Sequence, residues 1–190
     1  MNSIHDPIGL LAPLTVRAKI LLRKIWALEP KVEWDDDLPR TIEEEWFAIY
    51  NEISGIEKIS FTRSLTPIDA FGLPWLIIFS DGSKLAYGAV AYCRWQLTNG
   101  KFRSYLIMAK SKIAPLKTID IVRLELSGAV ISKRIRTYIE KEMKLQFEKV
   151  YHIVDSESVK AMIDKESYGY NTFIANCVGE IHQVTSQRMD

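Results

Sequence analysis

At 190 residues, the chain has room for one full domain, or for one domain with a helical appendage. Hydrophobic residues make up 47% and charged residues 26%, which is typical of globular proteins and excludes wholesale disorder. Because 25 basic and 24 acidic residues leave a net charge of +1, any binding of nucleic acid must come from local clusters of basic residues. The sequence shows no zinc-binding cysteine pattern, no signal peptide and no apolar run of bilayer length, so we expect a soluble intracellular protein that does not contact membranes.

The first part of the chain is predicted to be helical. Apolar residues recur at helical spacing over residues 13–28, beginning with a proline in a favoured first position and ending before Pro30. A second helix is predicted to begin at Thr41, which forms a Thr-x-x-Glu capping box with Glu44, and to end at Gly55. Two amphipathic helices bury little surface alone, so we expect this region to dock on another part of the protein.

After Pro74, the hydrophobic period changes to that of a sheet. A short apolar run ends in the turn Ser80-Asp81-Gly82-Ser83, and Asn99-Gly100 is a strong hairpin signal between two further runs. These patterns predict three consecutive strands followed by a basic loop. The predicted strands are residues 75–79, 86–95 and 102–109, and the predicted loop is residues 110–118.

The last third of the chain is predicted to contain helices and one further strand. A long amphipathic pattern predicts a helix over residues 121–143, and an apolar run predicts a strand over residues 149–154. That strand ends, like the first, in an aspartate. Ser156 is expected to cap a short helix that extends to Met162, and a final helix is predicted over residues 172–184.

This order of elements predicts an α/β fold. Its centre is a mixed sheet of three antiparallel strands plus a parallel strand, with flanking helices. The first and fourth strands can lie parallel at the centre of that sheet, and ligand chemistry collects at the carboxyl ends of such strands. Asp81 and Asp155 both lie at these ends. We therefore expect a functional site at that edge of the sheet.

A third carboxylate, Glu125, lies within the predicted long helix. Its neighbours three and four positions away are aliphatic or very small, so it is expected on or beside the face that packs against the sheet. An anionic side chain is costly to bury there unless it is paired or bound to a metal. Three carboxylates brought together would repel one another by roughly 4 kcal/mol for each pair about 4 Å apart at an effective dielectric near 20. A divalent cation would relieve this repulsion.

Asp81, Glu125 and Asp155 are therefore predicted to be both the catalytic residues and the metal ligands. Carboxylate oxygens without cysteine or histidine favour Mg²⁺ or Mn²⁺, and two such ions about 3.5–4 Å apart catalyse phosphodiester hydrolysis. We expect the side-chain oxygens of the three residues to converge at one edge of the sheet. His152 lies within an apolar strand and is expected to be structural.

Three short motifs resemble the first three carboxylate motifs of RNase H domains. They are residues 79–83, 123–126 and 153–156, each of which contains one of the three carboxylates. The wider sequence resembles the polyproteins of BEL/Pao retrotransposons over nearly the whole chain. The stretches that carry this resemblance are residues 6–13, 17–19, 86–90, 109–118, 173–176 and 180–181.

The resemblance implies a segment that follows the polymerase core of a retrotransposon reverse transcriptase. Residues 1–72 would be a helical connection region, and residues 73–190 an RNase H-like domain that lacks its final strand and helix. The implied reaction is hydrolysis of the RNA strand of an RNA–DNA hybrid with two Mg²⁺ or Mn²⁺ ions. The implied partners are the hybrid and the rest of the polyprotein, in the cytoplasm, in intracellular virus-like particles or in the nucleus. No residue matches the family's fourth carboxylate motif, so impaired activity is expected.

A locally basic stretch leads into the helix that carries Glu125. This basic stretch could bind the phosphates of an RNA–DNA hybrid, or it could be an ordinary solvated loop. The two serines that closely follow the motif aspartates are assigned to the same surface. The predicted substrate-binding residues are Ser83, Lys110, Lys112, Lys117, Arg123 and Ser156.

Two other functions compete with the nuclease hypothesis. The first is a non-catalytic remnant of the same fold that serves as a binding or structural module. The second is a retrotransposon aspartic peptidase. Such peptidases need Asp-Thr-Gly or Asp-Ser-Gly, whereas this chain has Asp81-Gly82-Ser83, so the sequence disfavours the peptidase.

Overall fold

A four-stranded mixed sheet forms the centre of the computed structural model, which describes residues 5–56, 60–165 and 168–183. The strand order is β3-β2-β1-β4, with β1 antiparallel to β2, β2 antiparallel to β3, and β1 parallel to β4. The predicted α/β fold and the parallel pairing of the first and fourth strands are thus confirmed. The elements are α1 (Ala12–Trp26), α2 (Arg40–Ser54), β1 (Ala70–Gly82), β2 (Ala86–Leu97), β3 (Phe102–Ile113), α3 (Ile121–Glu142), β4 (Lys149–Val154), α4 (Glu157–Asp164) and α5 (Thr172–His182).

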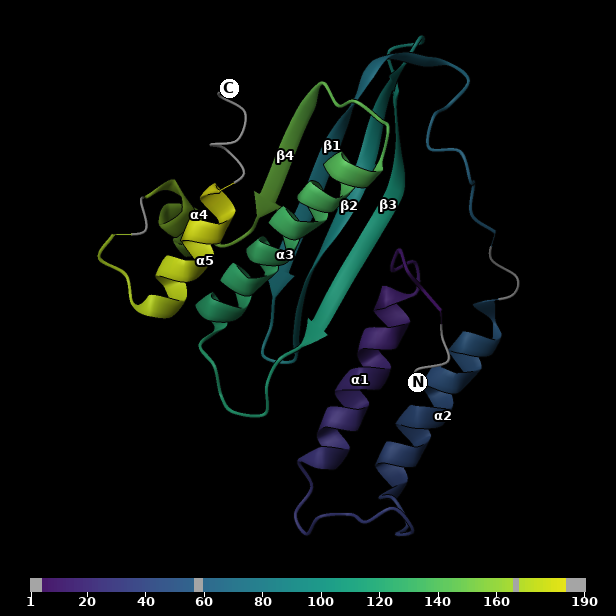
Figure 1. The fold of residues 1–190 in the computed structure, drawn as a ribbon. Coiled ribbons are helices and arrows are strands. Elements are labelled where there is room, and N and C mark those ends of the chain that lie inside the picture. Colours follow the sequence, from purple (N-terminus) through teal and green to yellow (C-terminus); the bar gives the residue numbers. More distant parts are fainter. Residues whose placement is uncertain (1–4, 57–59, 166–167, 184–190) are drawn as a thin grey trace.

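The main hydrophobic core lies between one face of the sheet and α3 (Figure 1). Alternate residues of a strand point to opposite faces, so Leu76 and Ile78 of β1 lie on the same side as Ala91 and Cys93 of β2. Helix α3 closes this core with an aliphatic stripe at helical spacing, Ile131, Ile135 and Ile139. The sheet and α3 therefore form one packed unit.

Helices α4 and α5 lie beside α3 and extend the same layer (Figure 1). Their contact is a second, smaller core in which Leu126 and Ala129 of α3 meet Val159 of α4 and Val178 of α5. Helix α5 begins where Asn171 accepts a hydrogen bond from the amide of Ile174. The predicted end of this helix at Val184 lies outside the described residues.

Helices α1 and α2 form a hairpin with its own small core of Ala18, Leu21, Ile42 and Ile49. The hairpin does dock, as expected, because α1 packs against β3. The loop before α1 also joins the edge of the sheet: the amide of Ala109 donates to the carbonyl of Ile8 at 2.8 Å. Within residues 5–56, 60–165 and 168–183, no helix has the length and apolarity needed to cross a bilayer.

Gly9 makes the close approach of this loop possible. Its φ of 76° lies in the left-handed region, and a Cβ there would stand 1.9 Å from the carbonyl oxygen of Ala109. Any side chain at position 9 would therefore push the loop off β3. The helical region and the sheet meet at this backbone contact.

The predictions for residues 110–113 and for the start of the second helix were wrong. The basic residues 110–113 are not in a loop, because β3 continues to Ile113 and Lys110 pairs with Ala89. Long charged side chains are tolerated on an edge strand, whose outer side faces water. The capping box is also absent. Helix α2 begins at Arg40, so Thr41 is already helical, and Glu44 bonds to Arg40 at 2.9 Å instead.

Candidate active site

The carboxyl ends of β1 and β4 meet at one edge of the sheet. These parallel strands pair up to Ser80 opposite Val154, so Asp81 and Asp155 are the next residue along each strand. Strand β1 is longer than predicted. It includes Asp81, which pairs with Gly88 of β2 instead of lying in a turn. The two aspartates therefore leave adjacent strands at the same level.

Helix α3 packs closely against the end of β1 at two glycines, Gly82 of β1 and Gly128 of α3. A Cβ on Gly82 would stand 2.5 Å from the amide nitrogen of Glu125, and a Cβ on Gly128 would stand 2.7 Å from the carbonyl oxygen of Asp81. Real Cβ atoms do not come this close to backbone, so both positions require glycine. The first two turns of α3, which carry Glu125, are thereby held against the strand that carries Asp81.

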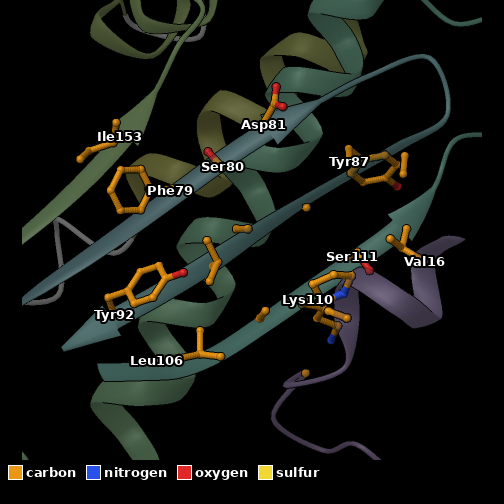
Figure 2. A pocket seen from close by; sticks show the side chains of 18 of the residues that line it. Val16, Phe79, Ser80, Asp81, Tyr87, Tyr92, Leu106, Lys110, Ser111 and Ile153 are labelled. Atoms are coloured by element: carbon orange, nitrogen blue, oxygen red, sulfur yellow. The ribbon is translucent and has the colours of Figure 1, made fainter. Parts of the chain in front are cut away.

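A groove of about 660 Å³ opens beside the two aspartates. Figure 2 shows side chains that line it, with Asp81 at the end of β1 and Phe79 and Tyr92 further along the sheet. The Phe79 and Tyr92 rings meet edge to face with their centroids 6.1 Å apart. Asp155 lines the same groove, and so does Lys110 of β3. The groove thus combines an apolar floor with charged groups of both signs.

The three predicted metal ligands are neighbours in the fold, but their side chains are not gathered. One oxygen of Asp81 accepts a hydrogen bond from the amide of Gly82 at 2.6 Å. Within the described part of the chain, no three His, Cys, Asp or Glu side chains lie close enough to hold one metal ion together. The expected convergence of the carboxyl oxygens is therefore not seen. The roles of Asp81, Glu125 and Asp155 stay predictions.

The predicted basic surface divides into residues with different surroundings. Lys110 lines the groove, whereas Lys112 extends from β3 opposite Tyr87, and Lys117 lies exposed in the loop before α3. The guanidinium of Arg123 stands 5.5 Å from the ring centroid of Phe173 on α5. Of these four residues, Lys110 alone lines the groove beside Asp81 and Asp155.

The two serines assigned to the substrate surface have local structural contacts. The Ser83 hydroxyl closes the turn between β1 and β2 by donating to the carbonyl of Ala86 at 2.9 Å. The Ser156 hydroxyl caps α4, as predicted, by accepting a bond from the amide of Val159 at 3.3 Å. Substrate binding by these two serines stays a prediction.

Loss of the α4 cap should be measurable. Replacing Ser156 by alanine is expected to lower the free energy of unfolding by about 1 kcal/mol, because the first turn of α4 loses the acceptor for an otherwise unpaired amide. Ser156→Asp should keep most of that stability, since aspartate is an equally good cap. Chemical denaturation of the three proteins measures the effect. Equal losses in both variants would show that the cap contributes nothing.

The sequence did not reveal that α1 lines the groove. Pro13 and Val16 of α1 and Leu10 just before it line the groove together with residues of the sheet, although they were assigned to a separate connection region. Asp6 shapes this wall, because its two carboxyl oxygens accept bonds from the amides of Leu10 and Leu11 at 2.9 and 2.8 Å. Residues on both sides of the predicted boundary at position 72 thus build one groove.

A mixed sheet in this strand order, with flanking helices, is consistent with an RNase H-like fold. Over residues 1–156, the chain matches the family model described as the Pao retrotransposon-like RNaseH-like domain, and it belongs to that family. The predicted resemblance to BEL/Pao retrotransposons is therefore confirmed. The family supports a general RNase H-like role. No curated protein matched the chain.

Proposed function

We propose that this domain hydrolyses the RNA strand of an RNA–DNA hybrid with two divalent cations held by Asp81, Glu125 and Asp155. The observation that carries the proposal is the meeting of three segments at one sheet edge: the end of β1, the end of β4 and the first turns of α3. A groove runs from that edge along the sheet. The family adds support, because it is an RNase H-like one.

The donor set at this edge fits Mg²⁺ or Mn²⁺. Its strong ligands are carboxylate oxygens from three different elements, and hard oxygen ligands are what these ions prefer. When bound, the ions would supply an activated water and charge stabilisation at the leaving oxygen. Asp81 is held in place by the Gly82 amide, which bonds to one of its oxygens and leaves the other available. Turning the Glu125 side chain toward the strand end would complete the set.

The groove gives the substrate two kinds of contact. Lys110 would bind a phosphate of the nucleic acid backbone, and the rings of Phe79 and Tyr92 would contact sugars or bases. Because α1 forms one wall, the connection region would bind the hybrid as well. The rest of the reverse transcriptase polyprotein is the proposed second partner. Impaired activity of these 190 residues remains a prediction.

Cleavage of an end-labelled RNA strand tests the function directly. The chain is expected to cut RNA paired with DNA, at the low rate that the predicted impairment implies, when Mg²⁺ or Mn²⁺ is present, and to leave an RNA–RNA duplex and a DNA duplex intact. Chelation of the metal should stop the reaction. Cleavage that persists with excess chelator would contradict the two-metal proposal, and equal cleavage of all three duplexes would contradict the substrate.

A non-catalytic binding module is the second candidate function. One observation favours it: the three carboxyl groups are not gathered in this conformation. It predicts that the chain binds the hybrid but cuts nothing in either metal. The aspartic peptidase is not favoured by any comparable observation, because Asp81 lies in a mixed sheet and the family description is that of an RNase H-like domain.

A further inference from the structure

A second pocket, of about 240 Å³, lies on the helix-covered side of the sheet, where β1 and β4 meet helices α3, α4 and α5. Ser80 of β1 lines both this pocket and the groove described above. The pocket is therefore separated from the candidate active site by one strand. Its polar lining residues are Ser80, Ser132, Lys133, Arg136, His152 and His182.

Two buried hydroxyl groups face this pocket. Ser80 is 8% exposed, and within the described part of the chain its Oγ has no hydrogen-bond partner. Ser132 is 1% exposed, and its Oγ lies 2.7 Å from Nδ1 of His152. A buried hydroxyl without a partner is costly, and such a group in a native structure calls for an explanation. A ligand that accepts a hydrogen bond would provide one.

The charged residues that line the pocket are basic. Lys133 and Arg136 line it from α3, and the described lining contains no carboxylate. The nearest acidic group along the helix, Glu140, bonds to Nε of Arg136 at 3.1 Å through the next turn of α3. Arginine has further N–H groups beyond Nε, so this pair leaves donors for a second partner. The pocket thus presents hydroxyl, imidazole, ammonium and guanidinium groups together.

We propose that this pocket binds a small tetrahedral oxyanion: a phosphate, either free or at the end of a nucleotide. Every oxygen of such an ion accepts hydrogen bonds, which matches the donors and the positive charge that stand among the apolar lining residues Ala129, Val154, Ile163 and Ile181. Ser80 would donate to it, Arg136 and Lys133 would neutralise it, and Ser132 would hold His152 in position. The site does not depend on metal binding at the groove, so it can be tested apart from the proposed nuclease function.

The histidine supplies an internal reporter of occupancy. His152 belongs to an edge strand and is exposed as a residue, but its ring is turned toward Ser132 and α3. Burial of the ring and then the charge of Arg136 lower the pKa of His152 to about 4, against the opposing effect of Glu140. A bound dianion favours the charged imidazole, so occupancy should raise this pKa.

Titration of the whole chain with inorganic phosphate, followed by NMR of the His152 ring, tests the proposal. Saturable shifts and a raised His152 pKa are expected. Arg136→Gln should weaken binding about tenfold or more, the loss typical of one hydrogen bond between charged groups. Lys133→Gln, which leaves the Arg136 pair with Glu140 intact, should also weaken it. The matched control is Arg134→Gln, which removes an exposed arginine of the same helix that pairs with Glu180. Linear shifts, or equal affinity in all four proteins, would overturn the proposal.

Ser80→Ala is a second test variant, which should weaken phosphate binding without lowering the stability of the free protein. It removes the unpaired hydroxyl, so the melting temperature without phosphate should stay equal or rise. The increase in melting temperature on adding phosphate should shrink. The role given to Ser80 would be contradicted if the variant melted at a lower temperature without phosphate and still showed the full increase in melting temperature when phosphate is added.

Comparison of two probes distinguishes the sources of the phosphate. Adenosine 5′-monophosphate should bind more tightly than inorganic phosphate if the pocket takes the end of a nucleotide, and more weakly if it takes the free ion. Adenosine, which lacks the phosphate, is expected to leave the His152 ring unchanged. Shifts of the His152 ring that adenosine reproduces would show that the phosphate group is not what binds.

Discussion

Replacing Asp81 by asparagine is expected to lower the rate of cleavage of an RNA–DNA hybrid about 100-fold or more. Loss of a residue that only hydrogen-bonds to a metal ligand already lowers activity about 10–100-fold, and Asp81 is proposed to be a ligand itself. Asparagine keeps the size of the side chain, and its oxygen can still accept the bond from the Gly82 amide. The change therefore removes a charge at the end of β1 with little disturbance of the strand. Initial rates at saturating Mg²⁺ measure the effect.

The same substitution should separate metal binding from the stability of the fold. At a hundredfold excess over its dissociation constant, a cation that binds only the native state stabilises it by about 2.7 kcal/mol. Asp81→Asn should lose most of this gain, and without metal it should be about as stable as the parent, because asparagine can still accept the bond from the Gly82 amide.

Asp164→Asn is the matched control for both measurements. Asp164 is an exposed residue at the end of α4 and does not line the groove. Its replacement should leave the cleavage rate and the metal response unchanged. If Asp81→Asn kept the parental metal response, Asp81 would not be a ligand, and the proposed site would be wrong.

The sequence was sufficient to predict the sheet because its signals are local. The strand Lys149–Val154 and the hairpin at Asn99-Gly100 follow from apolar runs and turn chemistry within a few residues. The order of the elements, a hairpin and a long helix between the first and fourth strands, then predicted the parallel pairing. The extent of β3 was missed because Lys110 and Lys112 are typical of a loop, and only pairing with β2 keeps them in a strand.

The sequence was sufficient to choose the candidate residues of the site, but not to predict how their side chains are arranged. Carboxylates at two strand ends and on a helix can be found by their order, whereas the distances between their oxygens depend on side-chain rotamers and on bonds such as the one to the Gly82 amide. The α1 wall depends on the contact of Gly9 with Ala109, which lie 100 positions apart in sequence. The pocket beside Ser80 likewise combines residues of five elements, β1, α3, β4, α4 and α5, none of them unusual alone.

Replacing Gly128 by alanine should test how closely α3 must approach the strand that carries Asp81. The new Cβ would lie 2.7 Å from the Asp81 carbonyl oxygen and 3.3 Å from that of Gly88, and both are backbone atoms of paired strands that cannot turn away. Overpacking of this kind costs about 1–3 kcal/mol, occasionally more. Since alanine also gains about 1 kcal/mol over glycine in a helix interior, we expect a net loss of up to about 2 kcal/mol in the free energy of unfolding, together with a loss of cleavage.

The matched control is Gly179→Ala on α5, where a Cβ would meet no atom within 4 Å. With open space around it, the same substitution should raise the free energy of unfolding by about 0.5–1 kcal/mol through helix propensity alone. Chemical denaturation of both variants, beside amide NMR shifts at the end of β1, separates the clash from propensity. If Gly128→Ala were as stable as Gly179→Ala and left those shifts unchanged, the tight contact between α3 and β1 would not exist. Glu125 would then lack the support that holds it beside Asp81.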